Sequence, residues 1–193
     1  MRIGIDLRSV ASQVDRHALA LEADELGLWA VLVGGAAGEE TIEAAAIAAQ
    51  TSSIHIGVHL DGHSGEHPLT LAEELAVLDH LSERRALGVV DGDRRLVEHV
   101  ADLLAGRIVD GVALTPPPAQ TALPVWAATD IERCALTGDV AVDGPLIDRR
   151  RDEGCTHLFV SWPGSLLVLA RHLATRAAGP DFPTIVAELA DQL

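Results

Sequence analysis

Strand-like and helix-like segments alternate four times in the first 93 residues, and this alternation limits the fold more than any other feature. The short apolar runs, typical of buried strands, are residues 2–7, 29–33, 54–60 and 86–90. The helical patterns that follow them end at residue 26 and cover residues 39–50, 67–81 and 94–104. Repeats of this kind make the strands parallel and the helices crossovers, so the sequence predicts an α/β fold.

Two helices carry apolar stripes that we expect to face the sheet. The first helix has Ser9 and Ser12 as candidate N-caps. Its predicted stripe consists of Val10, Val14, Ala18 and Leu21. The third helix begins with His67-Pro68, and its predicted stripe consists of Leu71, Leu75, Leu78 and Leu81.

The second half of the chain is less regular. Residues 108–114 favour a strand or half a hairpin, and residues 115–120 form a Pro-rich extended connection. Further strands are predicted over residues 123–128, 139–142 and 156–161. Further helices are predicted over residues 131–136, 143–153, 166–177 and from 184 onward.

Composition narrows the class of protein. A chain of 193 residues is expected to form a single domain over residues 1–193, and its net charge of −15 argues against nucleic acid and anionic membrane as partners. The sequence shows neither a membrane-spanning run nor a signal peptide. The two cysteines, Cys134 and Cys155, have no metal or disulfide spacing, and we interpret them as small apolar core residues. We expect a cytoplasmic protein with reduced thiols.

A run of histidines and carboxylates after the third strand is a candidate metal site. Its members are His59, Asp61, His63, Glu66 and His67. Imidazole and carboxylate groups bind divalent metals, but this spacing matches no standard motif. The sequence therefore favours a solvated loop, and we expect no metal.

Residues 67–93, HPLTLAEELAVLDHLSERRALGVVDGD, resemble the signature of the bacterial luciferase-like flavin-dependent oxidoreductases. That family has hPxxlAxxxatLDxlSxGRxxLGvGxG over a helix, a barrel strand and a cofactor loop. Two departures stand out: the SxGR element is here Ser82-Glu83-Arg84-Arg85, and Val90 replaces a glycine. Weaker similarity extends to residues 20–33, 45–59, 123–128 and 143–153.

The resemblance implies a (β/α) TIM-barrel-like fold, normally of eight strands. Family members are longer, and the missing part lies between Ala128 and Asp143. We therefore expect a reduced or incomplete barrel with parallel strands. Such a barrel leaves an edge or an apolar surface to cover. The resemblance implies a homodimer through the helices at residues 39–50 and 69–81.

The resemblance also implies a cofactor site at the carboxyl ends of the strands. The implied cofactor-binding residues are Val58, His59, Gly88, Val90, Asp91, Gly92 and Thr129. An unusual cis peptide is implied near Val58-His59, behind a flavin ring, and Thr129 is the phosphate candidate. Against this, Val90 adds a branched side chain and Asp91 and Asp93 add negative charge, which Arg94 and Arg95 offset. The alternative is an ordinary strand-to-helix turn with no ligand.

Two functions remain open. The first is an oxidoreductase or monooxygenase that uses FMN or F420 on an unknown small substrate, with His59 as a weak candidate for proton transfer. The sequence favours a hydrogen-bonded loop histidine for His59, and packing residues rather than pocket walls for Trp126 and Trp162. The second is a cofactor-free relative that serves as a binding or partner subunit. If Val90 alone blocks the cofactor, Val90→Gly should restore flavin binding.

Overall fold

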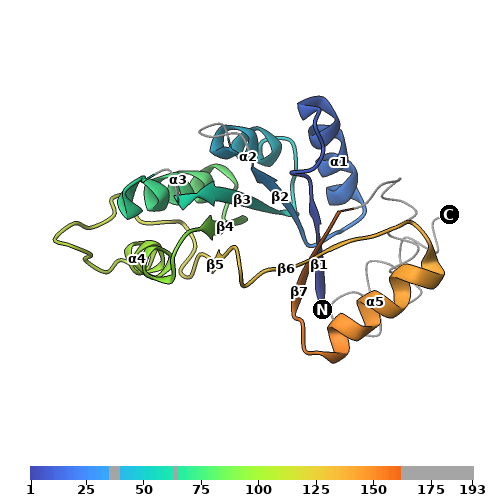
Figure 1. Cartoon of the computed structure of the whole chain (residues 1–193). Helices are drawn as coiled ribbons and strands as arrows, with labels where there is room; N and C mark the ends of the chain where they lie inside the picture. The colour runs from blue at the N-terminus through green and yellow to red at the C-terminus, as the bar shows by residue number, and fades with distance from the viewer. Residues whose placement is uncertain (35–39, 63–64, 162–193) are drawn as a thin grey trace. The chain divides into compact units, whose positions relative to one another are not determined.

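A computed structural model of the chain describes residues 1–34, 40–62 and 65–161 (Figure 1). The elements in these residues are β1 (Arg2–Asp6), α1 (Gln13–Glu25), β2 (Ala30–Gly34), α2 (Glu40–Ala48), β3 (His55–Asp61), α3 (Pro68–Leu81), β4 (Ala86–Asp91), α4 (Arg94–Leu104), β5 (Val125–Ala127), β6 (Glu132–Ala135), α5 (Val140–Asp152) and β7 (His157–Ser161). The first eight elements, β1 to α4, begin and end within two residues of their predicted bounds in nearly every case. The helices predicted over residues 166–177 and from 184 lie outside the described residues.

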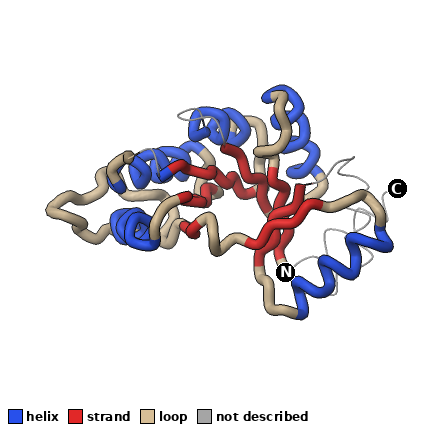
Figure 2. The backbone as a smooth tube through the Cα atoms, in the orientation of Figure 1, coloured by secondary structure: helices blue, strands red, loops and turns tan. Residues whose placement is uncertain are grey.

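The described strands form one seven-stranded sheet in the order β5-β4-β3-β2-β1-β7-β6. The strands are parallel, and helices follow most of them (Figure 2). In this order β1 lies between β2 and the last strand, β7, as the first strand of a (β/α) barrel does. In a doubly wound sheet, the neighbour of the first strand on that side would be a strand from the middle of the chain. The fold is therefore a reduced (β/α) TIM-barrel-like fold, and this prediction is confirmed.

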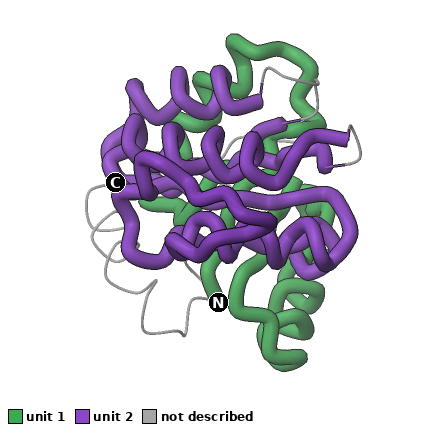
Figure 3. The backbone as a smooth tube through the Cα atoms, turned by 90° about the vertical axis from the view of Figure 1, so that its left-hand side faces the viewer, with its two compact units in different colours: residues 1–31, 132–193 green, residues 32–131 purple. Residues whose placement is uncertain are grey.

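The chain divides into two compact units, residues 1–31 with 132–193 and residues 32–131 (Figure 3). In the second unit, β3 pairs with β4 from Ile56↔Ala86 to Asp61↔Asp91. There β4 pairs with β5 from Gly88↔Val125 to Val90↔Ala127. Helix α2 packs on β3, α3 on β4 and α4 on β5, and this layering buries the apolar side chains of the unit.

In the first unit, β7 is hydrogen-bonded to both β1 and β6. Helix α1 starts after Ser12, whose hydroxyl accepts the Asp15 N–H at 3.3 Å. The stripe predicted for this helix is wrong, because Val14 is 77% exposed and the buried residues are Ala20 and Ala23. The buried face of the helix is lined by the small methyl groups of alanine instead of the larger predicted side chains.

Residues 131–142 correct the prediction most clearly, because helix and strand are exchanged. Residues 132–135 form β6 rather than a helix, and residues 139–142 open α5 rather than a strand. The strand exists because it pairs with β7, 26 residues farther along (Glu132↔Leu158), and such pairing overrides a weak local preference. The helix starts early because the Asp139 carboxylate accepts the Ala141 N–H at 2.8 Å.

Helix α3 follows the predicted pattern except at its last residue. His67 caps it, with the ring Nδ1 accepting the Leu69 N–H at 3.1 Å, and Pro68 occupies the first turn. Leu71, Leu75 and Leu78 are buried as predicted, whereas Leu81, the last residue of the helix, is 57% exposed. The chain then turns through Arg84 at φ 71°, the position where the luciferase-like pattern has glycine.

Two further segments lie beside α3 and α4. Residues 108–114 form a tight turn instead of a strand, with one antiparallel bridge between Val109 and Val112. The Pro-rich connection is fixed to the end of α3 by the buried Asp79. The Asp79 carboxylate accepts the Gln120 backbone N–H at 2.7 Å and the Gln120 side-chain Nε2 at 2.6 Å.

Candidate functional site

The two faces of the β3-β4-β5 sheet differ in what they contact. A Cβ atom on Gly88 would lie 2.7 Å from Cδ1 of Leu75, so this face of β4 lies under α3. Val58 is the register partner of Gly88, and Val90 follows two residues later, so both point toward the helices as well. The opposite face, here called the His59 face, carries His55, His59, Asp61, Val89, Asp91 and Trp126.

The seven predicted cofactor residues therefore separate into groups. Val58 and Val90 are fully buried on the helix side, where the Val90 side chain packs rather than obstructs a ligand. His59 and Asp91 share the His59 face and are half-buried. Whether any of these residues binds a cofactor stays a prediction.

Asp61 and Asp91 are register partners at the carboxyl ends of two adjacent parallel strands. Neighbouring strands lie about 4.8 Å apart, so the two carboxylates stand side by side on the His59 face. Sequence reasoning assigned Asp61 only to the rejected metal site and missed this pair. The available signal was that both strands end in the same dipeptide, Asp-Gly.

The two glycines of those dipeptides have a packing role. A Cβ on Gly92 would lie 2.6 Å from Cδ2 of Leu96, and a Cβ on Gly62 would meet the same methyl group. At the end of β2, a Cβ on Gly34 would lie 2.9 Å from the Cβ of His59. Leu96 of α4 thus lies against the backbone of Gly62 and Gly92, and the backbone of Gly34 in β2 lies against His59. This packing accounts for the three glycines without a ligand and holds His59 in position.

The region predicted to hold a phosphate is lined by acidic groups. The Thr129 hydroxyl is hydrogen-bonded to a carboxylate oxygen of Asp130 at 3.3 Å. Arg94 forms an ion pair with Glu98 at 2.9 Å on the surface of α4. The hydrogen bond and charge of Glu98, followed by the charge of Asp130, raise the pKa of Arg94. Two of the three donors that the sequence offered to a phosphate, Thr129 and Arg94, are therefore engaged by carboxylates of the chain itself. The third, Arg95, is exposed in the first turn of α4.

The cis peptide expected near Val58-His59 is wrong. In the described residues the only cis bond is Thr115-Pro116, so the bonds of β3 are trans. A cis bond between non-proline residues costs about 3 kcal/mol, and the unbroken pairing of β3 with β4 keeps this backbone extended.

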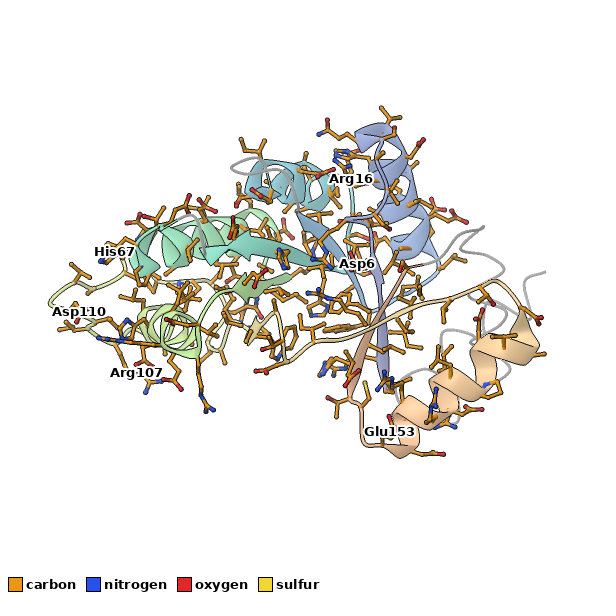
Figure 4. All side chains as sticks on the ribbon, in the orientation of Figure 1. Asp6, Arg16, His67, Arg107, Asp110 and Glu153 are labelled. Carbon is orange, nitrogen blue, oxygen red and sulfur yellow. The ribbon has the colours of Figure 1, made fainter. Side chains whose placement is uncertain are left out.

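The remaining candidates give no site. No group of three metal-ligating side chains occurs within residues 1–34, 40–62 and 65–161, and His63 and Trp162 fall outside these ranges. His67 is accounted for as the cap of α3, where Figure 4 labels it. Cys134 and Cys155 are half-buried rather than core residues, and burial raises the pKa of the Cys134 thiol to about 11.

Comparisons with known proteins identify the fold. No family model matches the chain, and no curated protein does. Among solved structures, the chain is similar to EDTA monooxygenase from Chelativorans sp. BNC1, with TM-score 0.57 and 15% identity over 100% of this chain and 70% of that one. It is similar to the oxygenating constituent of 3,6-diketocamphane monooxygenase from Pseudomonas putida, solved with FMN, with TM-score 0.52 and 13% identity over 97% and 63%.

A third similar structure is the coenzyme F420-dependent tetrahydromethanopterin reductase from Methanopyrus kandleri, with TM-score 0.51 and 16% identity over 96% of this chain and 82% of that one. The structures that the chain resembles are thus luciferase-like monooxygenases and reductases, as the signature at residues 67–93 predicts. At these identities the likeness establishes the fold. None of the helices within the described ranges has the length and hydropathy of a membrane span.

Proposed function

We propose that the chain is a luciferase-like oxidoreductase that acts as a single domain over residues 1–193. In this proposal a flavin-type cofactor, of the class to which FMN and F420 belong, binds at the carboxyl ends of β3, β4 and β5, and a small substrate binds beside it. The fold supports this, because parallel barrels place their sites at that edge. The observation that carries the proposal is the presence of partly exposed His59 and Trp126 on one face of that edge.

The residues fit the ring of such a cofactor better than its phosphate. A flat ring system can stack on Trp126, and the imidazole of His59 can exchange a hydrogen bond or a proton with it. When bound, the cofactor supplies hydride or oxygen chemistry, and the protein orients it and its substrate. The side chains near the expected position of the phosphate, Asp61, Asp91 and Asp130, are acidic and do not fit a phosphate.

The test compares two histidines of the same strand and face. His59 lies near the carboxyl end of β3, whereas His55 lies at its amino end. The chain is titrated with FMN, F420 and riboflavin, and binding is followed by the flavin absorbance and fluorescence. We expect His59→Asn to weaken binding several-fold and His55→Asn to leave it unchanged. Absence of binding to all three compounds contradicts the proposal.

A second function, a cofactor-free binding or partner subunit, is favoured by one specific observation. Carboxylates of the chain itself occupy the positions where a phosphate would need donors. A protein of this kind would act through its surfaces. The titration above distinguishes the two functions, because a partner subunit binds none of the three compounds.

We also propose a homodimer that forms through α2 and α3. The two helices pack together, and the Thr41 hydroxyl donates to the Glu74 carboxylate at 2.8 Å. Their outer surface exposes Ile42, Val77 and Leu81, which are 71%, 51% and 57% accessible. Light scattering after size exclusion should give twice the mass of one chain. Val77→Glu should produce monomers, whereas the control Ile108→Glu, in the turn after α4, should not.

We propose a cytoplasmic location as well. Both cysteines, Cys134 and Cys155, are free thiols in the structure, which fits a reducing compartment. Fractionation of cells that express the tagged protein tests this directly. Recovery of the protein outside the cytoplasmic fraction contradicts it.

A further inference from the structure

At the carboxyl edge of the second unit, the N-termini of α3 and α4 each have one N–H group that is bound to a side chain of the chain itself. The N-terminus of α4 is closed by Asp93, whose carboxylate accepts the Leu96 N–H at 2.8 Å. The N-terminus of α3 is closed by His67, whose ring accepts the Leu69 N–H at 3.1 Å. Free N–H groups at helix N-termini are a common means of binding phosphate in α/β proteins, and here a side chain of the chain binds one of them at each of the two helices.

Two side-chain donors near this edge, Arg94 and Thr129, are also paired with carboxylates. The Arg94 guanidinium is bound to Glu98 at 2.9 Å, and its side chain is 92% exposed. The Thr129 hydroxyl is bound to Asp130 at 3.3 Å. A phosphate would have to displace a carboxylate from each donor and so break a charge-assisted hydrogen bond. A ligand without charge can bind without breaking these hydrogen bonds.

The first unit repeats this arrangement independently. At the end of β6, a buried carboxylate, Asp143, accepts the Thr137 N–H at 2.8 Å, the Thr137 hydroxyl at 2.9 Å and the Gly138 N–H at 2.9 Å. At the end of β1, Arg8 donates two hydrogen bonds to the Asp6 carboxylate, at 2.8 and 2.6 Å. Figure 4 labels Asp6 at this strand end. In both places a carboxylate of the chain itself engages the donors at a strand end.

We infer that the site discriminates by charge: the chain takes a neutral flavin, riboflavin, and rejects the phosphorylated cofactors FMN and F420. The adjacent carboxylates Asp61 and Asp91 are the specificity-determining residues, because they are register partners at the carboxyl ends of two strands of the proposed site. This inference rests on the proposed function, since it names the cofactor that the same site accepts.

The experiment measures the affinities of riboflavin and FMN for the intact chain at low and high salt. A phosphate carries nearly two negative charges at neutral pH. At low salt we expect riboflavin to bind roughly tenfold more tightly than FMN, the factor that one unscreened carboxylate beside a dianion produces even in water. The difference should shrink in 1 M salt, where the screening length falls to about 3 Å.

The matched variants are Asp91→Asn and Glu83→Gln. Each removes one negative charge, the first at the carboxyl end of β4 and the second in the turn before its amino end. We expect Asp91→Asn to strengthen FMN binding roughly tenfold and to change riboflavin binding by less than about twofold. Glu83→Gln should alter neither. The salt series on the unmodified chain gives the same answer without relying on the folding of a variant.

The outcomes separate this inference from the proposed function. Riboflavin binding with FMN bound equally well or better overturns the charge selection and leaves the proposed function standing. An equal effect of Glu83→Gln and Asp91→Asn shows a general charge effect and also overturns it. No binding of any flavin overturns both.

Discussion

Replacement of Gly88 by alanine should destabilise the protein through α3, not through a cofactor. The new methyl group would lie 2.7 Å from Cδ1 and 3.0 Å from Cδ2 of Leu75, where carbon atoms prefer about 3.5–4.0 Å. Leu75 is fully buried, so it has little freedom to move aside. Overpacking of this kind costs about 1–3 kcal/mol, and the loss of a glycine from the unfolded chain returns about 0.4–1 kcal/mol. The expected net loss is about 1–2 kcal/mol.

A double-mutant cycle makes this reasoning specific to one contact. Leu75→Ala alone should cost about 2–5 kcal/mol because it leaves a cavity under α3. In the double variant the methyl group introduced by Gly88→Ala enters that cavity, so the two losses should fall short of additivity by about 1–2 kcal/mol. Urea unfolding, followed by tryptophan fluorescence, measures all four free energies. A Gly88→Ala variant within about 0.5 kcal/mol of the parent chain, or strictly additive losses, refutes the proposed contact.

Three further predictions concern single residues. Arg84→Gly should raise the free energy of unfolding by about 0.5–1 kcal/mol, because Arg84 has φ 71°; an unchanged or lower urea midpoint contradicts this. Burial, followed by the charge of Arg2, lowers the pKa of His157, so the unfolded chain binds a proton at higher pH than the folded chain. The stability from neutral His157 is therefore present above about pH 6.5 and lost as pH falls below it, and His157→Asn should flatten the urea midpoint between about pH 7.5 and 5.5. Burial raises the pKa of the Cys134 thiol to about 11. In a Cys155→Ala variant, where Cys134 is the remaining cysteine, it should react with iodoacetamide at about pH 7.5 roughly a hundredfold more slowly than an exposed thiol does, as followed by mass spectrometry.

The first half of the fold was predictable because its segments are long and strongly patterned. Helix α4 has the predicted bounds, and α3 begins at the predicted His67-Pro68 pair. The exchange of helix and strand in residues 131–142 was not predictable, because β6 has four residues and depends on a partner strand far along the chain. Local preference carries little information in a segment that short.

The candidate site was predictable in its position but not in its orientation. Alternation along β4 shows that Gly88 and Val90 share one face and that Val89 and Asp91 share the other. Both faces of a buried parallel strand are apolar, so the pattern does not show which face lies under the helices. The contact between Gly88 and Leu75 supplies that information. It turns Val90 away from the ligand edge, and Val90→Gly should then cost stability without improving flavin binding.

A crystal structure of the chain grown with riboflavin would show whether a flavin binds on the His59 face. We expect electron density for the ring system at the carboxyl ends of β3, β4 and β5, against Trp126 and within hydrogen-bond distance of His59. The ribityl tail should pass beside Asp61 and Asp91. Density for the ring on the helix side or on the first unit, or an empty His59 face at saturating riboflavin, would contradict it.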